Sequence, residues 1–140
     1  MRSVLAFLLT ACLVTACNVE STMDEFQPGQ VWEYETRAGE EASRLTICRI
    51  EDKDGHTVVH IYVDGLALKS PHSPDGVGRF IGHMPFREDA VRGSVRKLVE
   101  TRPELPDFEE GYETWKANNG GVFTTSVAEG IDFVEEAVNR

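Results

Sequence analysis

Three consecutive segments in which apolar and polar residues alternate restrict the fold more than any other feature of the sequence. They span residues 30–37, 43–51 and 56–64. In the third segment Val59, Ile61 and Val63 share one side, and this period of two is typical of a strand with one buried face. Short turns separate the segments, and the second turn contains Asp54-Gly55, a strong hairpin signal. The pattern predicts an antiparallel meander with its second strand at the centre.

The pattern is less regular after the third segment. The two leucines of residues 65–68 predict a continuation of that strand or a short fourth one. Residues 69–78 are rich in proline and glycine, which predicts a loop. Residues 79–83 favour a further strand, which we expect to end before Met84-Pro85.

The C-terminal part has the spacing of helices. The predicted helices span residues 88–101, residues 108–118 and a segment that begins at Ser126. Asp107 with Glu110, and Ser126 with Glu129, have the spacing of capping boxes at the second and third helix starts. Residues 122–125 allow a short strand between them.

Strands followed by helices predict an α+β fold. We expect an antiparallel meander of about four to five strands, with about three C-terminal helices packed on its one apolar face. Residues 30–140 are long enough for a single domain of this kind.

The first sixteen residues have the features of an export signal. Arg2 is followed by an apolar run from Val4 to Ala16, and small residues precede a cleavage point. The run is short for a membrane-spanning helix, which needs roughly 20 residues. We expect residues 1–16 to be removed and the polar residues 17–29 to act as a flexible tether.

The stretch Val14-Thr15-Ala16-Cys17 resembles the lipobox of bacterial lipoproteins. The resemblance implies that the Cys17 thiol carries a diacylglycerol, that cleavage occurs before it, and that palmitate-type acyl chains hold the protein on a membrane. The stretch ending at Cys12 fits the same pattern, but cleavage there would leave a very short hydrophobic segment, so Cys17 is preferred. Asn18 in place of an aspartate implies the outer membrane, facing the periplasm.

The charge and cysteine content exclude several classes of function. The net charge of −10 repels phosphate backbones, so nucleic acid is not expected as a partner. The glycines of residues 76–78 and 120–121 lie in predicted loops and lack the strand and helix that a phosphate cradle needs, so no cofactor is expected. With Cys17 lipidated, Cys48 has no disulfide partner and is expected to be buried as a small apolar residue.

A possible cleft lies where neighbouring strands present polar side chains. Its candidate residues are His60, Tyr62, Asp64 and His83. His56 and His60 are about 13 Å apart along a strand and cannot share a metal, so a metal site is not expected. No nucleophile motif of a known hydrolase type accompanies these residues.

Basic residues gather in the predicted first helix of this acidic chain. They are Arg87, Arg92, Arg96, Lys97 and Arg102. Pairing of Glu88 with Arg92 and of Arg96 with Glu100 at i, i+4 would make this an ordinary salt-bridged helix face. The alternative is that Arg92 and Arg96 form a docking patch for an acidic partner or a glycan.

Three stretches resemble a set of small bacterial proteins to which no activity is assigned. They are residues 29–37, 81–86 and 105–115, and the resemblance extends from Gly29 to about Thr125. The resemblance supports a domain that covers these residues, and it implies no particular activity.

These observations favour a lipid-anchored envelope protein that binds another envelope protein without catalysis, as an accessory, inhibitor or immunity-like module. The alternative is a small envelope hydrolase or ligand-binding domain with a cleft near His60, Asp64 and His83. A structural envelope protein without a ligand is a third possibility. A polar pocket between sheet and helices would favour the second reading, and a filled interface with an exposed patch would favour the first.

Overall fold

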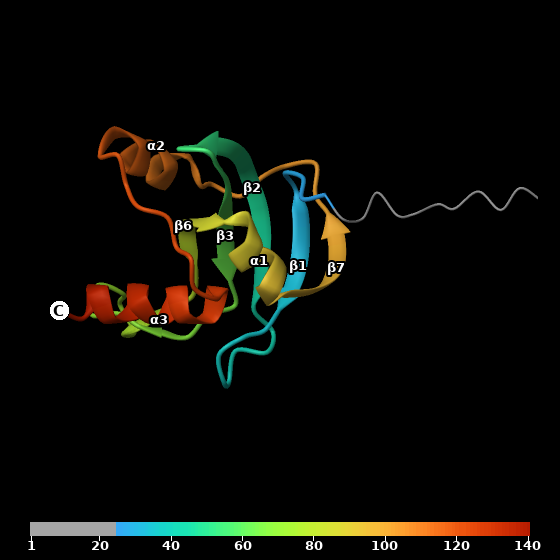
Figure 1. Cartoon of the computed structure of the whole chain (residues 1–140). Coiled ribbons are helices and arrows are strands. Elements are labelled where there is room, and N and C mark those ends of the chain that lie inside the picture. Colours follow the sequence, from blue (N-terminus) through green and yellow to red (C-terminus); the bar gives the residue numbers. More distant parts are fainter. Residues whose placement is uncertain (1–24) are drawn as a thin grey trace, which may run out of the picture.

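The computed structural model describes residues 25–140 and shows an α+β fold, as predicted (Figure 1). Five strands form one antiparallel sheet: β1 (Gln30–Tyr34), β2 (Arg44–Lys53), β3 (His56–Asp64), β6 (Ile81–Arg87) and β7 (Val95–Thr101). Their order is β6-β3-β2-β1-β7, so β2 is central, and the predicted meander of the first three strands is confirmed. The strands β4 (Leu68–Lys69) and β5 (Val77–Gly78) form a separate small ribbon. The helices are α1 (Glu88–Ser94), α2 (Glu109–Ala117) and α3 (Val127–Val138).

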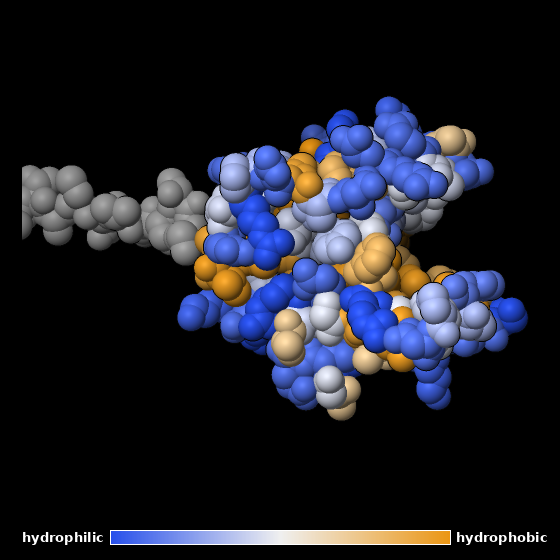
Figure 2. Space-filling model, turned by 180° about the vertical axis from the view of Figure 1, so that it is seen from behind, coloured by the Kyte–Doolittle hydropathy of each residue, from blue (hydrophilic) through white to orange (hydrophobic). Residues whose placement is uncertain are grey.

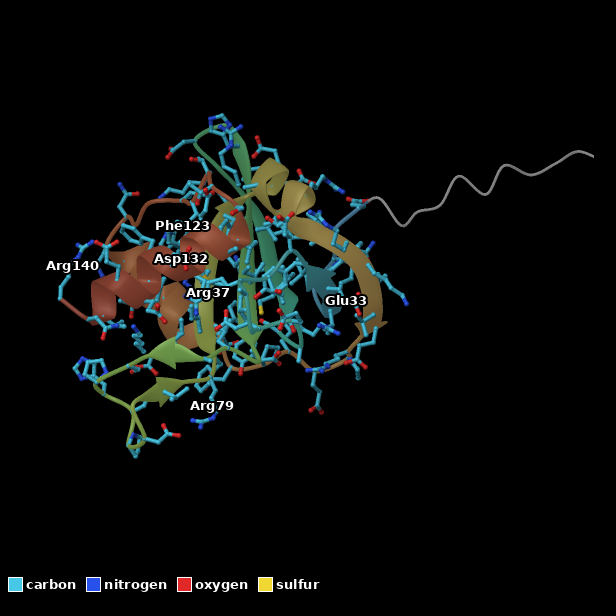
Figure 3. The ribbon with its side chains drawn as sticks, turned by 90° about the horizontal axis from the view of Figure 1, so that it is seen from below. Glu33, Arg37, Arg79, Phe123, Asp132 and Arg140 are labelled. Carbon is cyan, nitrogen blue, oxygen red and sulfur yellow. The ribbon has the colours of Figure 1, made fainter. Side chains whose placement is uncertain are left out.

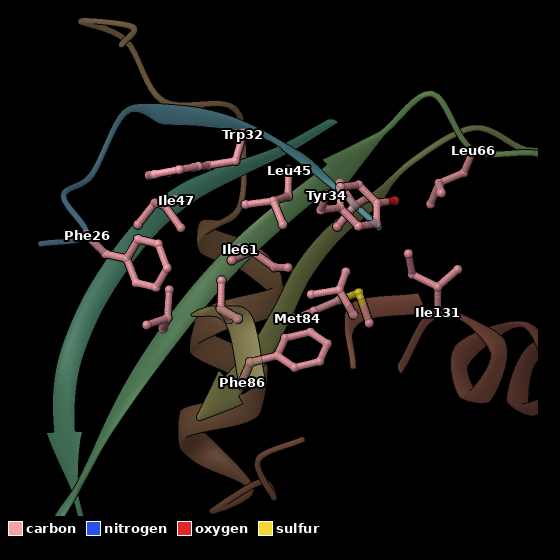
Figure 4. Close-up of a cluster of buried hydrophobic side chains, with 14 of the residues drawn as sticks. Phe26, Trp32, Tyr34, Leu45, Ile47, Ile61, Leu66, Met84, Phe86 and Ile131 are labelled. Carbon is pink, nitrogen blue, oxygen red and sulfur yellow. The ribbon is translucent and has the colours of Figure 1, made fainter. Parts of the chain in front are cut away.

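The main core lies on one side of the sheet, which we call the core face. It contains the fully buried side chains of Leu45, Ile47, Val59, Ile61 and Val63 from β2 and β3. Helices α1 and α3 cover these residues with buried side chains of their own, among them Ile131 of α3 (Figure 4). Each fully buried aliphatic side chain stabilises the fold by roughly 1.5–3 kcal/mol, so this layer dominates the stability of the domain.

Helix α2 covers the opposite side of the sheet, the α2 face, so the expectation that all three helices share one face is wrong. A second buried cluster there joins Cys48 of β2 to Phe108 and Tyr112, with Tyr62 and Trp115 packed around it. The alternation of β3 predicts that one side of the strand faces solvent, because the His60 and Tyr62 side chains on that side each carry a polar group. Their rings are nonetheless large enough to be buried under aromatic residues of α2.

The predicted helix over residues 88–101 is half helix and half strand. Helix α1 ends at Ser94, and β7 then pairs antiparallel with β1. Gly93 weakens the helix at this point, while Val95 and Val99 favour extended backbone. Pairing with β1, which would otherwise be an unprotected edge, therefore outweighs the helical spacing.

Strand β6 continues through Met84-Pro85, where we expected it to end. Pro85 is tolerated because β6 is an edge strand and this residue points its backbone away from β3. Its carbonyl accepts a hydrogen bond from the Phe123 amide at 2.9 Å, and the Arg87 amide donates to the Phe123 carbonyl at 2.9 Å. Residues 122–125 thus contribute a single bridge and no strand.

The helix starts confirm one of the two predicted caps. Ser126 and Glu129 form a complete capping box at α3. Helix α2 begins after Phe108 with no side-chain cap, so the box predicted for Asp107 and Glu110 does not form.

The folded part begins before residue 30. Phe26 is only 4% exposed and meets Trp32 edge to face, with ring centroids 5.7 Å apart. Gly29 is hydrogen-bonded to β2 and to the residue that follows β7, because its amide donates to the Ile47 carbonyl and its carbonyl accepts from the Arg102 amide, each at 2.8 Å. Phe26 and Gly29 therefore pack with the domain, although the sequence analysis predicts that they lie in the tether. No helix within residues 25–140 is long and apolar enough to cross a membrane.

Candidate functional site

A hydrogen-bonded chain of five side chains runs across the α2 face. Glu51 Oε1 lies 3.0 Å from His60 Nε2, and His60 Nδ1 lies 2.8 Å from His83 Nε2. The Tyr112 hydroxyl donates to Glu51 Oε2 at 2.8 Å, and Arg49 Nε donates to the same oxygen at 3.1 Å. The structure thus brings together two of the predicted site residues, His60 and His83, with three that were not predicted.

The sequence does not predict Glu51 as a site residue, because β2 contains a bulge. Simple alternation places Glu51 on the same side as Leu45 and Ile47, in the core. The register against β3 shifts between Ile47 and Arg49, so every residue after the bulge changes sides. Ile50 then joins the core and Glu51 reaches the α2 face, where it meets His60.

Burial fixes the charge states along this chain. Burial lowers the pKa of the fully buried His60, although Glu51 opposes the shift. Burial and the neighbouring His60 lower the pKa of His83 to about 4. Burial alone would raise the pKa of Glu51, but hydrogen bonds from Tyr112, Arg49 and His60 outweigh it and lower that pKa. At neutral pH both imidazoles are therefore neutral and Glu51 is ionised.

These charge states assign the tautomers of both histidines. An ionised carboxylate only accepts hydrogen bonds, so His60 must carry its proton on Nε2 and accept at Nδ1. His83 must then donate from Nε2, which leaves a lone pair on its Nδ1. That atom has no hydrogen-bond partner among residues 25–140 and is not sealed from solvent.

Aromatic residues of α2 fill the space over His60. The centroid of the His60 ring lies 4.9 Å from that of Tyr112 and 4.7 Å from that of Trp115, both in edge-to-face contact. The His83 ring stacks on His60 with centroids 5.1 Å apart. No open cleft therefore exists between the sheet and α2 at His60.

An open groove lies beside this filled interface, and we call it the His83 groove. Its volume is about 580 Å³, and it is lined by Phe80, Ile81, Gly82, His83, Asp107, Phe108, Glu110, Gly111 and Thr114. Gly111 allows α2 to lie against β6, since a Cβ there would be 2.7 Å from the Cβ of His83. Seen from behind, hydrophobic surface gathers in the hollow between the parts of the molecule that carry α2 and α3 (Figure 2).

Tyr62 and Asp64 lie outside the hydrogen-bonded chain. The Tyr62 ring stacks on Phe80, with centroids 5.7 Å apart, and so supports the rim of the groove. Asp64 ends β3, and its backbone carbonyl accepts a hydrogen bond from the Ser43 hydroxyl at 2.5 Å. The structure gives Asp64 no contact with His60 or His83.

Arg92 and Arg96 lie on different elements, and each has a carboxylate partner. Arg92 of α1 pairs with Glu88 at 2.8 Å, as predicted, and also lies 4.4 Å above the centre of the Phe26 ring. Arg96 lies on β7 and pairs with Glu35, so the predicted pairing with Glu100 does not form. The single helical face on which the docking patch was predicted does not exist.

A second polar cluster, also absent from the sequence predictions, fastens the β1–β2 connection to α3. The buried Glu40 carboxylate accepts two hydrogen bonds from Arg37, at 2.7 and 2.8 Å, and one from the Ala67 amide at 2.7 Å. Arg37 also reaches Asp132 of α3 at 3.0 Å (Figure 3). The Arg37, Glu40 and Asp132 side chains are therefore engaged in hydrogen bonds within the fold.

Cys48 is buried, as expected, and burial raises the pKa of its thiol to about 12. A thiol in this state is a poor nucleophile. In the part of the chain that the structure describes, no three histidine, cysteine or acidic side chains are arranged to hold a metal ion. Cys17 lies outside the described residues.

No family model matches the chain, and neither curated proteins nor solved structures give a match. The function must therefore be inferred from the residues and geometry of the chain itself.

Proposed function

We propose that the chain is a lipid-anchored protein of the bacterial cell envelope whose folded domain binds another macromolecule and does not catalyse a reaction. The anchor is Cys17, the end of a stretch that resembles a lipobox, and Asn18 favours the outer membrane, facing the periplasm. The partner is another envelope protein.

The observation that carries the proposal is the filled interface between the sheet and α2. A site for a small molecule is usually a concave cleft that buries most of its ligand. At His60 that space holds the rings of Tyr112 and Trp115, and His60 itself is fully buried. Beside this filled space lie the open His83 groove and the side chain of Phe80, which is 59% exposed. Aromatic residues such as Phe80 are enriched in the surfaces through which proteins contact other macromolecules.

The placement of the groove agrees with a tethered binding domain. Strands β1 and β7, next to which the described chain begins, lie at the opposite end of the molecule from α2 and α3 (Figure 1). A domain held to a membrane through its N-terminal side would therefore present the groove away from that membrane.

Intact mass and membrane fractionation of the native protein beside a Cys17→Ala variant test the anchor. We expect the native chain to begin at Cys17, to carry the mass of acyl chains and to sediment with membranes, while the variant does not. An unlipidated native chain would refute the anchor.

Photo-crosslinking in cells tests the binding role. A photoreactive residue at position 80 should yield a defined covalent complex, and one at the exposed position 54, on a hairpin turn, should not. The absence of any complex from position 80 across growth conditions would refute the binding role.

A second candidate function, a small hydrolase or ligand-binding domain, is favoured by the chain Glu51–His60–His83. A carboxylate that orients a histidine is the arrangement that prepares a general base. His83 lines a groove whose lining contains no cysteine or serine, so this candidate would have to activate water or the hydroxyl of Thr114. Loss of a hydrolytic activity in a His83→Gln variant that retains its fold would support it over the binding role.

A further inference from the structure

The His83 groove has negative charge with which no cationic side chain of the described residues forms an ion pair. Asp107 and Glu110 line its α2 side, and neither has a cationic partner within residues 25–140. The arginines are not free to supply one, because each arginine from Arg37 to Arg140 is already paired with another carboxylate. Acidic residues at a helix start are favoured by the helix dipole, but a neighbouring cation would stabilise these two further.

His83, one of the residues that line the groove, supplies a hydrogen-bond acceptor. The chain of bonds from Glu51 through His60 leaves the lone pair of His83 Nδ1 without a partner in the described structure. This atom can accept a hydrogen bond from an N–H or O–H group and cannot donate one. A ligand that fits it must therefore carry a donor.

The remaining walls are apolar and aromatic. Phe80 and Ile81 from the β6 side and Phe108 from the start of α2 line the groove. Phe80 is exposed, and its ring is held by stacking on Tyr62. A fixed aromatic ring attracts a cation to its face, and the apolar walls suit the methylene stem of a long side chain.

We propose that the His83 groove binds a lysine or arginine side chain on a basic segment of the partner protein. The cationic head would donate to His83 Nδ1 and pair with Asp107 and Glu110, while its stem lies along Phe80 and Ile81. This inference rests on the proposed function, since it names the chemistry of the partner.

The groove can be tested with blocked amino acids on the full chain in detergent, followed by NMR. The probes are the Nα-acetyl amides of lysine and arginine, and the matching amide of norleucine is a neutral control of similar length. We expect the two cationic probes to shift the ¹⁵N signal of His83 Nδ1 and the amide signal of Gly82, and norleucine to leave both unchanged. Equal shifts with norleucine would overturn the proposal, because the groove would then recognise only the apolar stem.

Two double variants separate the groove carboxylates from the general acidity of α2. Asp107→Asn with Glu110→Gln removes the carboxylates that line the groove, and Glu109→Gln with Glu113→Gln removes two exposed ones of α2 that do not. The first pair should weaken lysine binding about two- to fivefold for each carboxylate, the usual contribution of an exposed ion pair. The second pair should change it little. Equal weakening by both pairs would overturn a specific site.

Crosslinking from position 80 separates failure of this inference from failure of the proposed function. If a partner is captured equally well by the native chain and by the Asp107→Asn, Glu110→Gln variant, the binding role stands and the cationic contact is refuted. If the lysine probe binds but no partner is captured in cells, the groove recognises cations, and both the binding role and the assignment of its occupant to a protein are refuted.

Discussion

His60 Nδ1 and His83 Nε2 lie 2.8 Å apart, although 23 positions separate the two residues in the chain. The pairing of β3 with β6 brings the two rings together, and Glu51 fixes the direction of every proton along the chain of bonds. The two rings form the boundary between a filled, structural interface and the open groove, so changes at this pair affect both stability and binding.

The stability of the domain should fall as the pH is lowered from about 6.5 to about 4. The pKa of His83 falls from 6.5 in the unfolded chain to about 4 in the folded one, and that of buried His60 is also lowered. Between these values the unfolded state binds more protons than the folded state, so the free energy of unfolding rises with pH. The loss on going down through this window should be on the order of 2 kcal/mol, after discounting for the partial exposure of His83.

Urea unfolding at pH 7, 5.5 and 4.5 measures this effect. The titratable and charged groups that face the histidines are Glu51, Arg49 and Tyr112. Protonation of Glu51 also lowers the stability, but at a lower pH, because the pKa of Glu51 is lowered in the folded state. A His83→Gln variant should show a flatter dependence between pH 6.5 and 4.5 than the native chain. An equally steep dependence in the variant would show that other groups cause the acid sensitivity.

The sequence predicted the strands of this region but not the site they build. Alternation identified β2 and β3 and the turn between them, because a half-buried strand imposes a period of two. It could not reveal the bulge after Ile47, since a bulge changes no residue type and only moves Glu51 to the other side of the sheet. Of the predicted site residues, His60 and His83 lie in direct contact. Asp64 lies four positions along β3 from His60, about 13 Å away.

The second failure, at residues 95–101, has a different cause. The local spacing of valines and charged pairs does favour a helix there. Pairing with β1 is a contact between residues more than 60 positions apart, such as Tyr34 with Val95, and no window along the sequence contains it. Local preference predicts an element only where no distant strand competes for it.

Gly111→Ala should destabilise the domain. The added Cβ would meet the Cβ of His83 at 2.7 Å, so α2 would have to move away from β6. Overpacking of this kind costs about 1–3 kcal/mol, which outweighs the gain of about 1 kcal/mol in helix propensity.

Gly93→Ala is the matched control for that substitution. Gly93 also lies in a helix, and a Cβ there would meet nothing within 4 Å. The Gly93→Ala substitution should raise the free energy of unfolding by about 0.4–1 kcal/mol, because alanine lowers the conformational entropy of the unfolded chain. Denaturant unfolding of both variants decides the matter, and stabilisation by both would mean that α2 is not in close contact with β6.

Glu40→Gln should be strongly destabilising. The carboxylate is buried, and its two oxygens accept hydrogen bonds from Arg37 and from the Ala67 amide. An amide group accepts at only one of its ends, so the variant would lose the hydrogen bonds to one oxygen and would set an NH₂ group against the Arg37 or Ala67 donor. We expect a loss of about 3 kcal/mol in urea unfolding, the scale of a broken buried ion pair. The neighbouring exposed Glu41→Gln should leave the midpoint unchanged, and equal effects of the two variants would contradict a special role for Glu40.

Cys48 should resist alkylation until the domain unfolds. Burial raises the pKa of its thiol to about 12, and the sulfur lies 3.5 Å from the Thr46 carbonyl under the rings of α2. At pH 8 almost none of it is thiolate, and the reagent has no path to the sulfur. Iodoacetamide labelling followed by peptide mass spectrometry should show no modified Cys48 in the native chain and complete modification in 6 M guanidinium. Rapid labelling of the native protein would mean that α2 opens readily from the sheet, and the filled interface that supports a binding role over a catalytic one would then not be a stable feature of the molecule.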